Sequence, residues 1–337
     1  MPLNRRTLLT ATGGALAASA LPRAAAAATG AEMRERATRF IDSLEPAQRD
    51  AALFPFDTNQ RVAWNFMLGS ARAPGLALEQ MRAPQKDLAL DLLATGTSTL
   101  GLEKAMNIML QQDILRDEWG KGRPDRNRER FSAQIYGLPS ASDPWAWRWE
   151  GHHLSLTFTM VGDEIVSTTP SAFSSEPNTV PSGPHRGLVV LKDEEALGRA
   201  LFTGLEGAER RAALAFEGSP GNIQSVRGAD RQIAGQVVGL ALGDMPEASR
   251  AIAERLIEVY TTEVLPSPLA ATQAARLRGE DMAAARFAWG GANLEGSIYY
   301  RITGANFLIE FATLRNQPEH QHAVFHDTAR NFGRHVV

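Results

Sequence analysis

The sequence predicts an α+β fold, with a helical N-terminal part and an antiparallel sheet flanked by helices in the C-terminal part. In residues 31–137 the apolar side chains recur near helical spacing, whereas from Pro144 onward they alternate with polar ones. Near the C-terminus, Gly304-Ala305 separates two short strand-like segments, which is typical of an antiparallel hairpin. No internal repeat is visible. We therefore expect one mature unit of residues 29–337, with a helical subregion at 31–137 and a sheet-containing region at 144–337.

The N-terminus has the layout of a twin-arginine export signal. Arg5-Arg6 precedes a weakly apolar stretch at 11–21, and the alanines of 24–28 offer small-residue cleavage sites. The apolar stretch is shorter than the roughly 20 residues that span a membrane. We expect residues 1–28 to be a signal peptide, membrane contact only during export, and a periplasmic or secreted mature protein. An ordinary secretory signal is the alternative.

Helices are expected wherever apolar residues return every three or four positions. Pro84 suits the first turn of one of them, because proline lacks the N–H that a first turn leaves unpaired. The predicted helices are 33–44, 84–94, 100–119, 194–216, 246–262 and 269–278.

A long strand is predicted from Pro144 to Val161, because Trp145, Trp147 and Trp149 alternate with other residues and apolar side chains continue beyond them. Its pleat either runs unbroken or shifts at a bulge at Gly151. The neighbouring His152 and His153 point to opposite faces in either case, so at most one of them should bind a metal. The later predicted strands are 284–289, 296–303, 306–313 and 320–325, and residues 167–187, rich in proline and serine, are predicted as a long loop.

All seven histidines follow residue 150, and five of them lie in two short motifs, one at 151–156 and one at 319–326. Imidazole is the commonest metal ligand in proteins. The spacing of His320 and His322 places both rings on one face of a strand. We predict a mononuclear metal site built from His320, His322 and a histidine of the pair His152 and His153.

A carboxylate could complete this site. Glu310 follows an apolar run, and a buried carboxylate needs a cation or hydrogen-bond donors. Arg301, on the neighbouring predicted strand, is the competing partner. We assign Glu310 and Arg301 to candidate catalytic roles, and His326 is left open as a further ligand.

The amino-acid composition limits which partners and which metal ligands are possible. Removal of residues 1–28 takes away three arginines and no acidic residue, so the formal net charge falls from −3 to −6. A mildly acidic protein repels phosphate backbones, which argues against nucleic acid as a partner. Cysteine is absent, so any metal would be held by nitrogen and oxygen donors, and copper, zinc and iron are the candidates.

The chain resembles an uncharacterised family, the domain of unknown function 3500, over residues 145–333. The resemblance implies that many members carry an export signal, and it does not indicate an activity. The segments that carry it are 147–156, Thr169-Pro170, Phe173, Phe287-Ala288-Trp289, Tyr299-Tyr300-Arg301-Ile302, Ile309-Glu310, His320-Gln321-His322 and Asn331-Phe332-Gly333. Glu319 departs from the family pattern, which has an asparagine before the first closing histidine.

Other site types fit less well. The chain has neither the His-Glu-x-x-His of zinc peptidases nor the Gly-x-Ser-x-Gly of serine hydrolases, and a cupin would need a glycine where Leu314 stands. The expected function is an exported metal-dependent enzyme acting on a small-molecule or peptide substrate, with redox chemistry preferred over hydrolysis. The alternative is a non-catalytic periplasmic protein that binds a metal or a small ligand.

Overall fold

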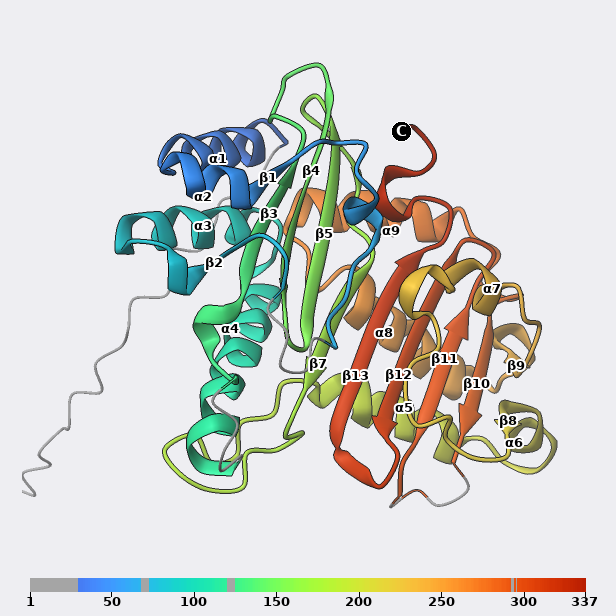
Figure 1. Cartoon of the computed structure of the whole chain (residues 1–337). Helices are drawn as coiled ribbons and strands as arrows, with labels where there is room; N and C mark the ends of the chain where they lie inside the picture. The colour runs from blue at the N-terminus through green and yellow to red at the C-terminus, as the bar shows by residue number, and fades with distance from the viewer. Residues whose placement is uncertain (1–29, 68–72, 120–124, 292–293, 295) are drawn as a thin grey trace, which may run out of the picture.

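The computed structural model describes residues 30–337 except 68–72, 120–124, 292–293 and 295. The predicted export signal lies outside the described residues. A single 13-stranded sheet runs through the molecule, with helices along its sides (Figure 1). Within the described ranges, no helix combines the length and the apolar character needed to cross a membrane.

Each predicted helix overlaps a helix of the structure, whereas two short helices, at 46–52 and 230–234, were not predicted. Pro84 lies in the first turn of its helix, as expected, and the Ser98 hydroxyl accepts the Gly101 N–H (3.0 Å) to cap the next one. The predicted helix 194–216 is divided in two and ends as a strand. The helices are α1 (Gly30–Asp42), α2 (Pro46–Ala52), α3 (Ala83–Thr95), α4 (Thr99–Ile114), α5 (Lys192–Gly204), α6 (Gly207–Ala213), α7 (Asp230–Ala234), α8 (Glu247–Thr261) and α9 (Ser267–Arg278).

The sheet is mixed, so the expectation of a purely antiparallel sheet was only partly correct. Its order is β1-β3-β4-β5-β7-β13-β12-β11-β10-β8, with β2, β6 and β9 attached at the sides. Neighbours are antiparallel except for β1–β3 and β8–β10. The strands are β1 (Leu53–Phe54), β2 (Leu76–Ala77), β3 (Ser132–Tyr136), β4 (Pro144–Gly151), β5 (Leu154–Val161), β6 (Glu164–Ser167), β7 (Ser171–Ser175), β8 (Leu214–Phe216), β9 (Leu240–Ala241), β10 (Arg286–Gly290), β11 (Tyr299–Thr303), β12 (Phe307–Leu314) and β13 (Gln317–Asp327).

Three of these strands lie where the sequence analysis placed helix. Strands β1, β2 and β3 fall within 31–137, so this part is not purely helical. Strand β7 lies inside the predicted loop 167–187, at the centre of the sheet, where it pairs with β5 and β13. These strands are two to five residues long, which is too short to show a period-two pattern in sequence.

The predicted long strand from Pro144 to Val161 is instead a hairpin. The chain reverses at His152-His153, and Gly151 pairs with Leu154 across the turn. Because residues paired across a hairpin share a face, Trp149 and Leu156 lie on the same side of the sheet. The tryptophans therefore share a face with the apolar residues of β5, but through cross-strand pairing and not through a bulge.

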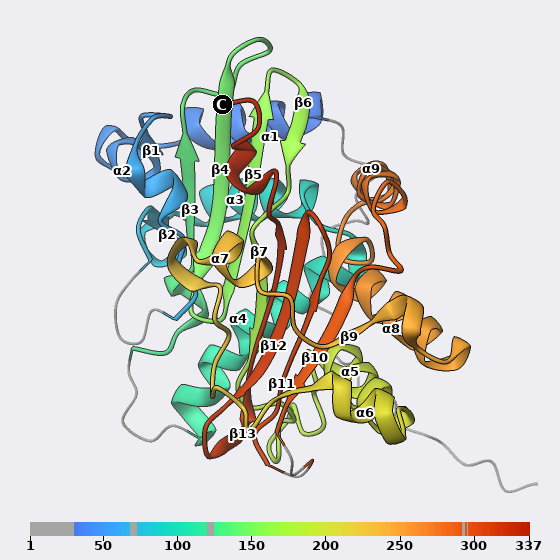
Figure 2. The same cartoon turned by 90° about the vertical axis from the view of Figure 1, so that its right-hand side faces the viewer.

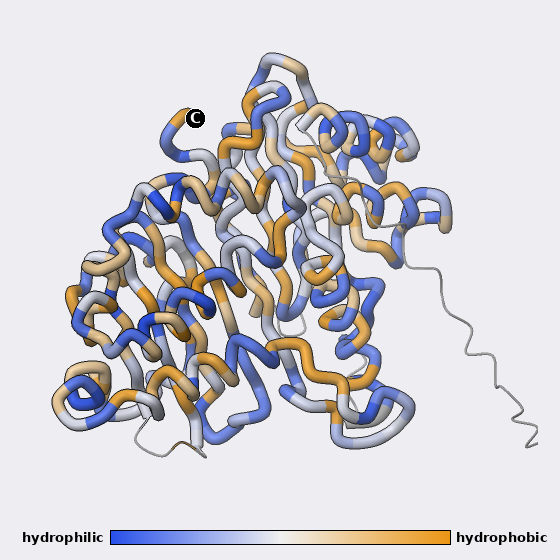
Figure 3. Tube along the Cα trace, turned by 180° about the vertical axis from the view of Figure 1, so that it is seen from behind, coloured by the Kyte–Doolittle hydropathy of each residue, from blue (hydrophilic) through white to orange (hydrophobic). Residues whose placement is uncertain are grey.

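The two faces of the sheet differ in chemistry. One face carries the tryptophans of β4 and packs against the helices in a large apolar core. In a view from behind, blue and orange segments alternate along the helices, as expected when each helix has one buried and one solvated side (Figure 3). The other face buries polar groups on central strands, namely Arg148, Glu150, Ser155, Thr157, Arg301, Glu310, His322 and His326.

Irregular segments cover the polar face. Trp64 and Phe66 from the chain after β1, Ile223 from the chain after β8, and Phe332 near the C-terminus pack together on it. Figure 2 shows α7 on this side of the sheet, across from α8 and α9. Buried polar side chains need partners, and on this face the covering segments supply many of them.

The fold contains an internal duplication, so the expectation of no repeat was wrong. The order helix, helix, strand, strand, helix, helix and then a set of antiparallel strands occurs twice, from α1 to β7 and from α5 to β13, with the short helix α7 inserted between β8 and β9. Strands β1 and β8 each pair in parallel with an equivalent strand, β3 and β10, and β2 and β9 pair antiparallel with the same two. The halves meet where β7 and β13 pair antiparallel, with Ser171 opposite Phe325 (Figure 1).

A short sequence motif also occurs once in each half. Gly75-Leu76-Ala77-Leu78-x-x-Met81 matches Gly239-Leu240-Ala241-Leu242-x-x-Met245. Both glycines have positive φ (96° and 89°), and a Cβ on either would lie within 2.6 Å of a carbonyl oxygen of the strand beside it. The same backbone approach is therefore made in each half.

Candidate metal centre

The two histidine motifs meet at the junction of the halves. His152 and His153 form the two-residue turn between β4 and β5 of the first half, and His320 and His322 lie on β13 of the second. The Nε2 atom of His320 lies 2.8 Å from Nε2 of His153 and 3.1 Å from Nε2 of His322. The side chains that sequence reasoning grouped are thus brought together by the fold.

The turn explains why both neighbouring histidines reach the site, against the expectation that they point to opposite faces. His153 has φ of +74°, a left-handed conformation that non-glycine residues rarely adopt. Its N–H donates to Phe66 O and its carbonyl accepts from Ser174 N–H, both at 2.8 Å. The rings of His152 and His153 stack with centroids 3.6 Å apart.

The nitrogen separations fit a shared ion. Two nitrogens at metal–nitrogen distances of about 2.0–2.1 Å cannot lie more than about 4 Å apart. His153, His320 and His322 meet this condition through Nε2 of His320. A second, wider group consists of His152, His153, Glu176 and His320, whose donor atoms lie within 4.8 Å of one another. This group does not include His322, whose Nε2 lies 3.1 Å from Nε2 of His320.

Hydrogen bonds direct the lone pairs of two imidazoles toward this point. His322 Nδ1 lies 2.7 Å from Asn222 Oδ1, which also accepts the Ile223 N–H (2.8 Å) and must therefore be the oxygen. His152 Nδ1 lies 2.9 Å from Oε1 of Gln112, whose Nε2 donates to Ile108 O. Each Nδ1 is thus the protonated nitrogen, and each Nε2 carries a lone pair, as metal-binding imidazoles require.

His320 has the carboxylate of Glu176 near its other nitrogen, with Nδ1 3.4 Å from Oε1. A carboxylate there favours a proton on Nδ1 of His320. Nε2 of His320 then carries a lone pair, which faces the lone pair on Nε2 of His322. Two facing lone pairs repel each other unless a proton or a metal ion lies between them. The donor set is therefore complementary to a metal ion. Sequence reasoning missed Glu176, Gln112 and Asn222, because no periodicity marks a polar residue in a loop or on a helix as a partner of distant histidines.

Burial keeps these imidazoles neutral. The pKa of His153 is well below its ordinary value, first because of burial and then because of the neighbouring His152 and His320. The pKa of His322 is also well below its ordinary value, through burial and through His320. Neutral imidazole is the form that binds metal.

Glu310 and Arg301 lie on the same face but make other contacts. Glu310 accepts the Gln224 and Ser225 N–H groups (both 2.9 Å) and the Tyr299 hydroxyl (2.6 Å). Arg301 donates to Gln236 Oε1 (3.0 Å). Neither side chain forms an ion pair or hydrogen bond with the four histidines in the described part of the chain, and Glu310 lies outside the grouped donors.

His326 is held in a network of its own. Asn331 Nδ2 donates to Asp230 (2.9 Å) and lies 2.8 Å from His326 Nδ1, so Nδ1 is the acceptor. His326 Nε2 therefore carries the proton and donates to Ser225 Oγ (3.0 Å). A serine nucleophile needs the opposite arrangement, with the imidazole accepting. The network holds the loop that contains Ser225 in place and does not resemble a hydrolase triad.

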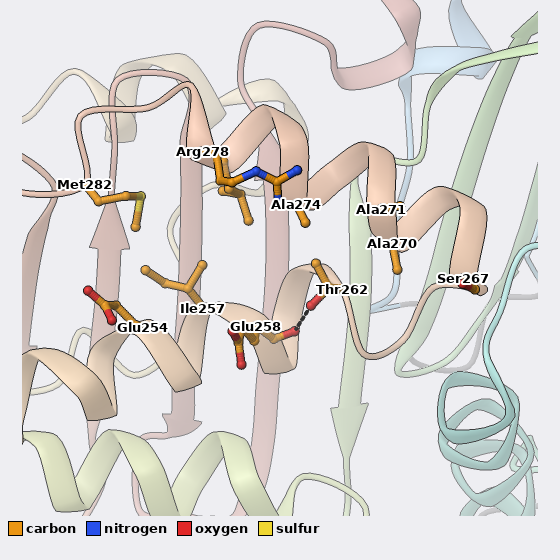
Figure 4. Close-up of a pocket in the computed structure, with 11 residues that line it drawn as sticks. Glu254, Ile257, Glu258, Thr262, Ser267, Ala270, Ala271, Ala274, Arg278 and Met282 are labelled. Carbon is orange, nitrogen blue, oxygen red and sulfur yellow. Dashed lines mark hydrogen bonds between the residues drawn. The ribbon is translucent and has the colours of Figure 1, made fainter.

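A groove of about 550 Å³ lies elsewhere, between α8 and α9 (Figure 4). Its lining is largely apolar, with Ile257, Leu277 and Met282 among it and no histidine. Nothing in this groove connects it with the histidine centre.

The family comparison covers nearly the whole described chain. A model of the family described as protein of unknown function, DUF3500, matches residues 26–334, and the chain belongs to this family. No curated protein and no solved structure matches it.

Proposed function

We propose that this member of the DUF3500 family is an exported, metal-dependent enzyme with a mononuclear, histidine-rich site at the junction of its two halves. The observation that carries the proposal is the approach of Nε2 of His320 to Nε2 of His153 and His322, at 2.8 and 3.1 Å. The amide that holds Nδ1 of His322 supports it, since metal-bound histidines commonly donate their other N–H to such a partner.

The donor set suits copper, zinc or iron. Three imidazole nitrogens with a carboxylate nearby, and no thiolate anywhere in the chain, match the preferences of these ions. Redox chemistry is preferred over hydrolysis, because nitrogen-rich ligation favours a redox metal and the twin-arginine route carries proteins that have already folded. When bound, the metal would supply an electron-transfer or Lewis-acid centre for a small-molecule or peptide substrate.

The uneven burial of the donors favours an enzyme over a metal carrier. His153 and His322 are buried, whereas His152 is half-buried and the Glu176 side chain keeps 15% of its surface exposed. A small ligand would reach the ion from the side of His152 and Glu176. The deep burial of the other rings is the observation that favours the alternative, a periplasmic metal-binding protein without catalysis.

Metal analysis tests the proposal. Mature protein purified from its native compartment should hold about one equivalent of copper, zinc or iron, as expected for a mononuclear site. A redox enzyme should change the oxidation state of that metal reversibly when a reductant or oxidant is added. A carrier should instead transfer its metal to a chelator without such a change. Protein that holds no metal even after incubation with each ion would contradict both functions.

Export is tested separately. The double substitution Arg5→Lys and Arg6→Lys should leave the precursor in the cytoplasm, because the twin-arginine route depends on the arginine pair. Export of the double variant at the normal level would contradict this route and favour an ordinary secretory signal.

A further inference from the structure

We infer that loop 222–225 sets the metal-binding form of His322, with Asn222 acting on the ring and Glu310 acting through the loop backbone. Both are positioning residues, since neither reaches the converging nitrogens. The inference rests on the proposed metal centre and identifies the side chains that tune it.

Asn222 determines which nitrogen of His322 carries the proton. Its Oδ1 faces Nδ1 of His322 at 2.7 Å, and its orientation is fixed because Oδ1 also accepts the N–H of Ile223. The Nδ2 atom of Asn222 lies 3.1 Å from the sulfur of Met67 and so faces away from the ring. Loss of this amide would allow the proton to move to Nε2 of His322, where it would block metal binding.

Glu310 fixes the loop that carries Asn222. Its two carboxylate oxygens accept consecutive backbone N–H groups, Oε1 from Gln224 and Oε2 from Ser225. Glu310 is fully buried, and the Tyr299 hydroxyl gives Oε1 a second donor. A glutamine in its place has only one oxygen, so one of the two backbone donors would lose its acceptor.

The first half contains a comparable arrangement, at a position that is not equivalent to Glu310. Buried Glu150 accepts the Asn65 N–H at 2.9 Å, and the next residue, Phe66, accepts the N–H of His153 at 2.8 Å. In both halves a carboxylate on a central strand holds the backbone of a covering loop, and that loop contacts a histidine of the centre. This recurrence indicates that the loops position ligands as well as cover the sheet.

The test is zinc affinity, measured by competition with a chelator, for wild type, Asn222→Ala, Asn222→Asp and Glu310→Gln. Asn222→Ala and Glu310→Gln should bind zinc about 10–100-fold more weakly, the usual cost of removing an outer-shell partner. Asn222→Asp should recover most of the affinity, because a carboxylate also accepts from Nδ1. Asn127→Ala is the matched control, since Asn127 Oδ1 likewise accepts a nearby backbone N–H, from Glu129, but touches no histidine.

A second measurement separates positioning from general stability. In metal-free protein labelled with 15N-histidine, the proton of His322 should lie on Nδ1 in wild type and Asn222→Asp, and should lose this fixed position in Asn222→Ala. If Asn222→Ala does not fold, the same spectrum of Glu310→Gln decides. Wild-type affinity together with an unchanged His322 spectrum in the variants would overturn the inference while leaving the metal centre intact. A wild-type protein that binds no zinc, copper or iron would overturn the metal centre itself.

Discussion

The two halves of the molecule share a backbone plan but not their chemistry. The turn between β4 and β5 reads Gly151-His152-His153-Leu154, and the equivalent turn between β11 and β12 reads Gly304-Ala305-Asn306-Phe307. A backbone contact recurs as well, since Ser174 N–H donates to His153 O and Thr328 N–H donates to Asn306 O. The scaffold is therefore present twice, and histidines occupy only one of the two equivalent turns.

The strands opposite the turns show the same difference. The shared contact makes Thr328 equivalent to Ser174. The part of the first half that corresponds to the histidine stretch of β13 is residues 164–170, at β6 and just after it, and it contains no histidine. The metal centre is thus assembled from a turn of the first half and a strand of the second. The pseudo-symmetric place has neither component, so the comparison predicts that a single ion binds.

The largest expected effect follows removal of a ligand. His320→Ala and His322→Ala should each weaken metal binding by more than about 100-fold, beyond the usual cost of an outer-shell change. His185→Ala and His335→Ala should leave binding unchanged, because both residues are exposed and neither belongs to the grouped donors. Metal content after dialysis of the four variants checks this. Equal metal in all four would show that the histidines are structural.

Exchange of the turns tests the comparison directly. Replacing His152-His153 by Ala-Asn should abolish stoichiometric metal binding, because both ring nitrogens from the first half are lost. The reciprocal change of Ala305-Asn306 to His-His should create no second site, because the corresponding stretch of the first half, residues 164–170, offers no imidazole. Metal titration of both proteins is the measurement. A second bound equivalent in the reciprocal variant would show that the turn alone is sufficient.

Metal release on acidification should begin well below pH 6.5. Burial lowers the pKa of His153 and His322, so both stay neutral and able to bind as the pH falls through the ordinary range of histidine. Zinc retention measured across pH 4–7 checks the direction. Half-release at or above about pH 6.5, the value for a solvated imidazole, would contradict a buried site.

A smaller effect is expected on acid stability, through His326. Burial lowers its pKa from 6.5 to about 4. The unfolded chain therefore binds the proton more tightly, so the contribution to stability is complete above pH 6.5 and is lost as the pH falls toward 4. The loss should reach about 3 kcal/mol. Urea unfolding from pH 7 to 4 should show a weaker pH dependence for His326→Gln than for wild type, whereas His185→Gln should behave as wild type.

The smallest expected effect is a difference in stability between variants of two equivalent arginines. Arg148 and Arg301 each precede a turn glycine by three residues and each hold a covering segment. Arg148 donates to the Thr157 hydroxyl and to the carbonyls of Gln60 and Arg61, whereas Arg301 donates to the side chain and the carbonyl of Gln236.

Arg148→Lys should therefore lower the free energy of unfolding by about 1–2 kcal/mol more than Arg301→Lys, because lysine cannot serve several acceptors in fixed directions. Urea unfolding of the two variants measures the difference. Equal losses would mean that the two covering segments are held equally firmly.

The histidines could be found from sequence because their residue type and spacing carry the signal. His320 and His322 needed only the period of a strand to be placed on one face. Their partners could not be found in this way. Asn222 and Glu176 are loop residues, and their role depends on a backbone path that no local pattern encodes.

The missed hairpin has a related cause. Apolar alternation continues on both sides of Gly151, and the turn residues are two histidines and not an Asn-Gly or Asp-Gly pair. Period two therefore predicted one strand where the chain reverses. The duplication was missed because its clearest trace in the sequence is a single seven-residue motif, which begins at Gly75 and again at Gly239.

The pairing of β7 with β13 has a consequence for the order of folding. Ser171 and Phe325 are partners across the sheet although most of the second half separates them along the chain. Contacts of such long sequence separation form late, because the entropy of closing the intervening loop is lost before they provide any stabilisation. The histidines meet across this same junction, so each half should fold before the centre exists. We expect metal uptake to be among the last steps of maturation, and to report that the whole chain has closed.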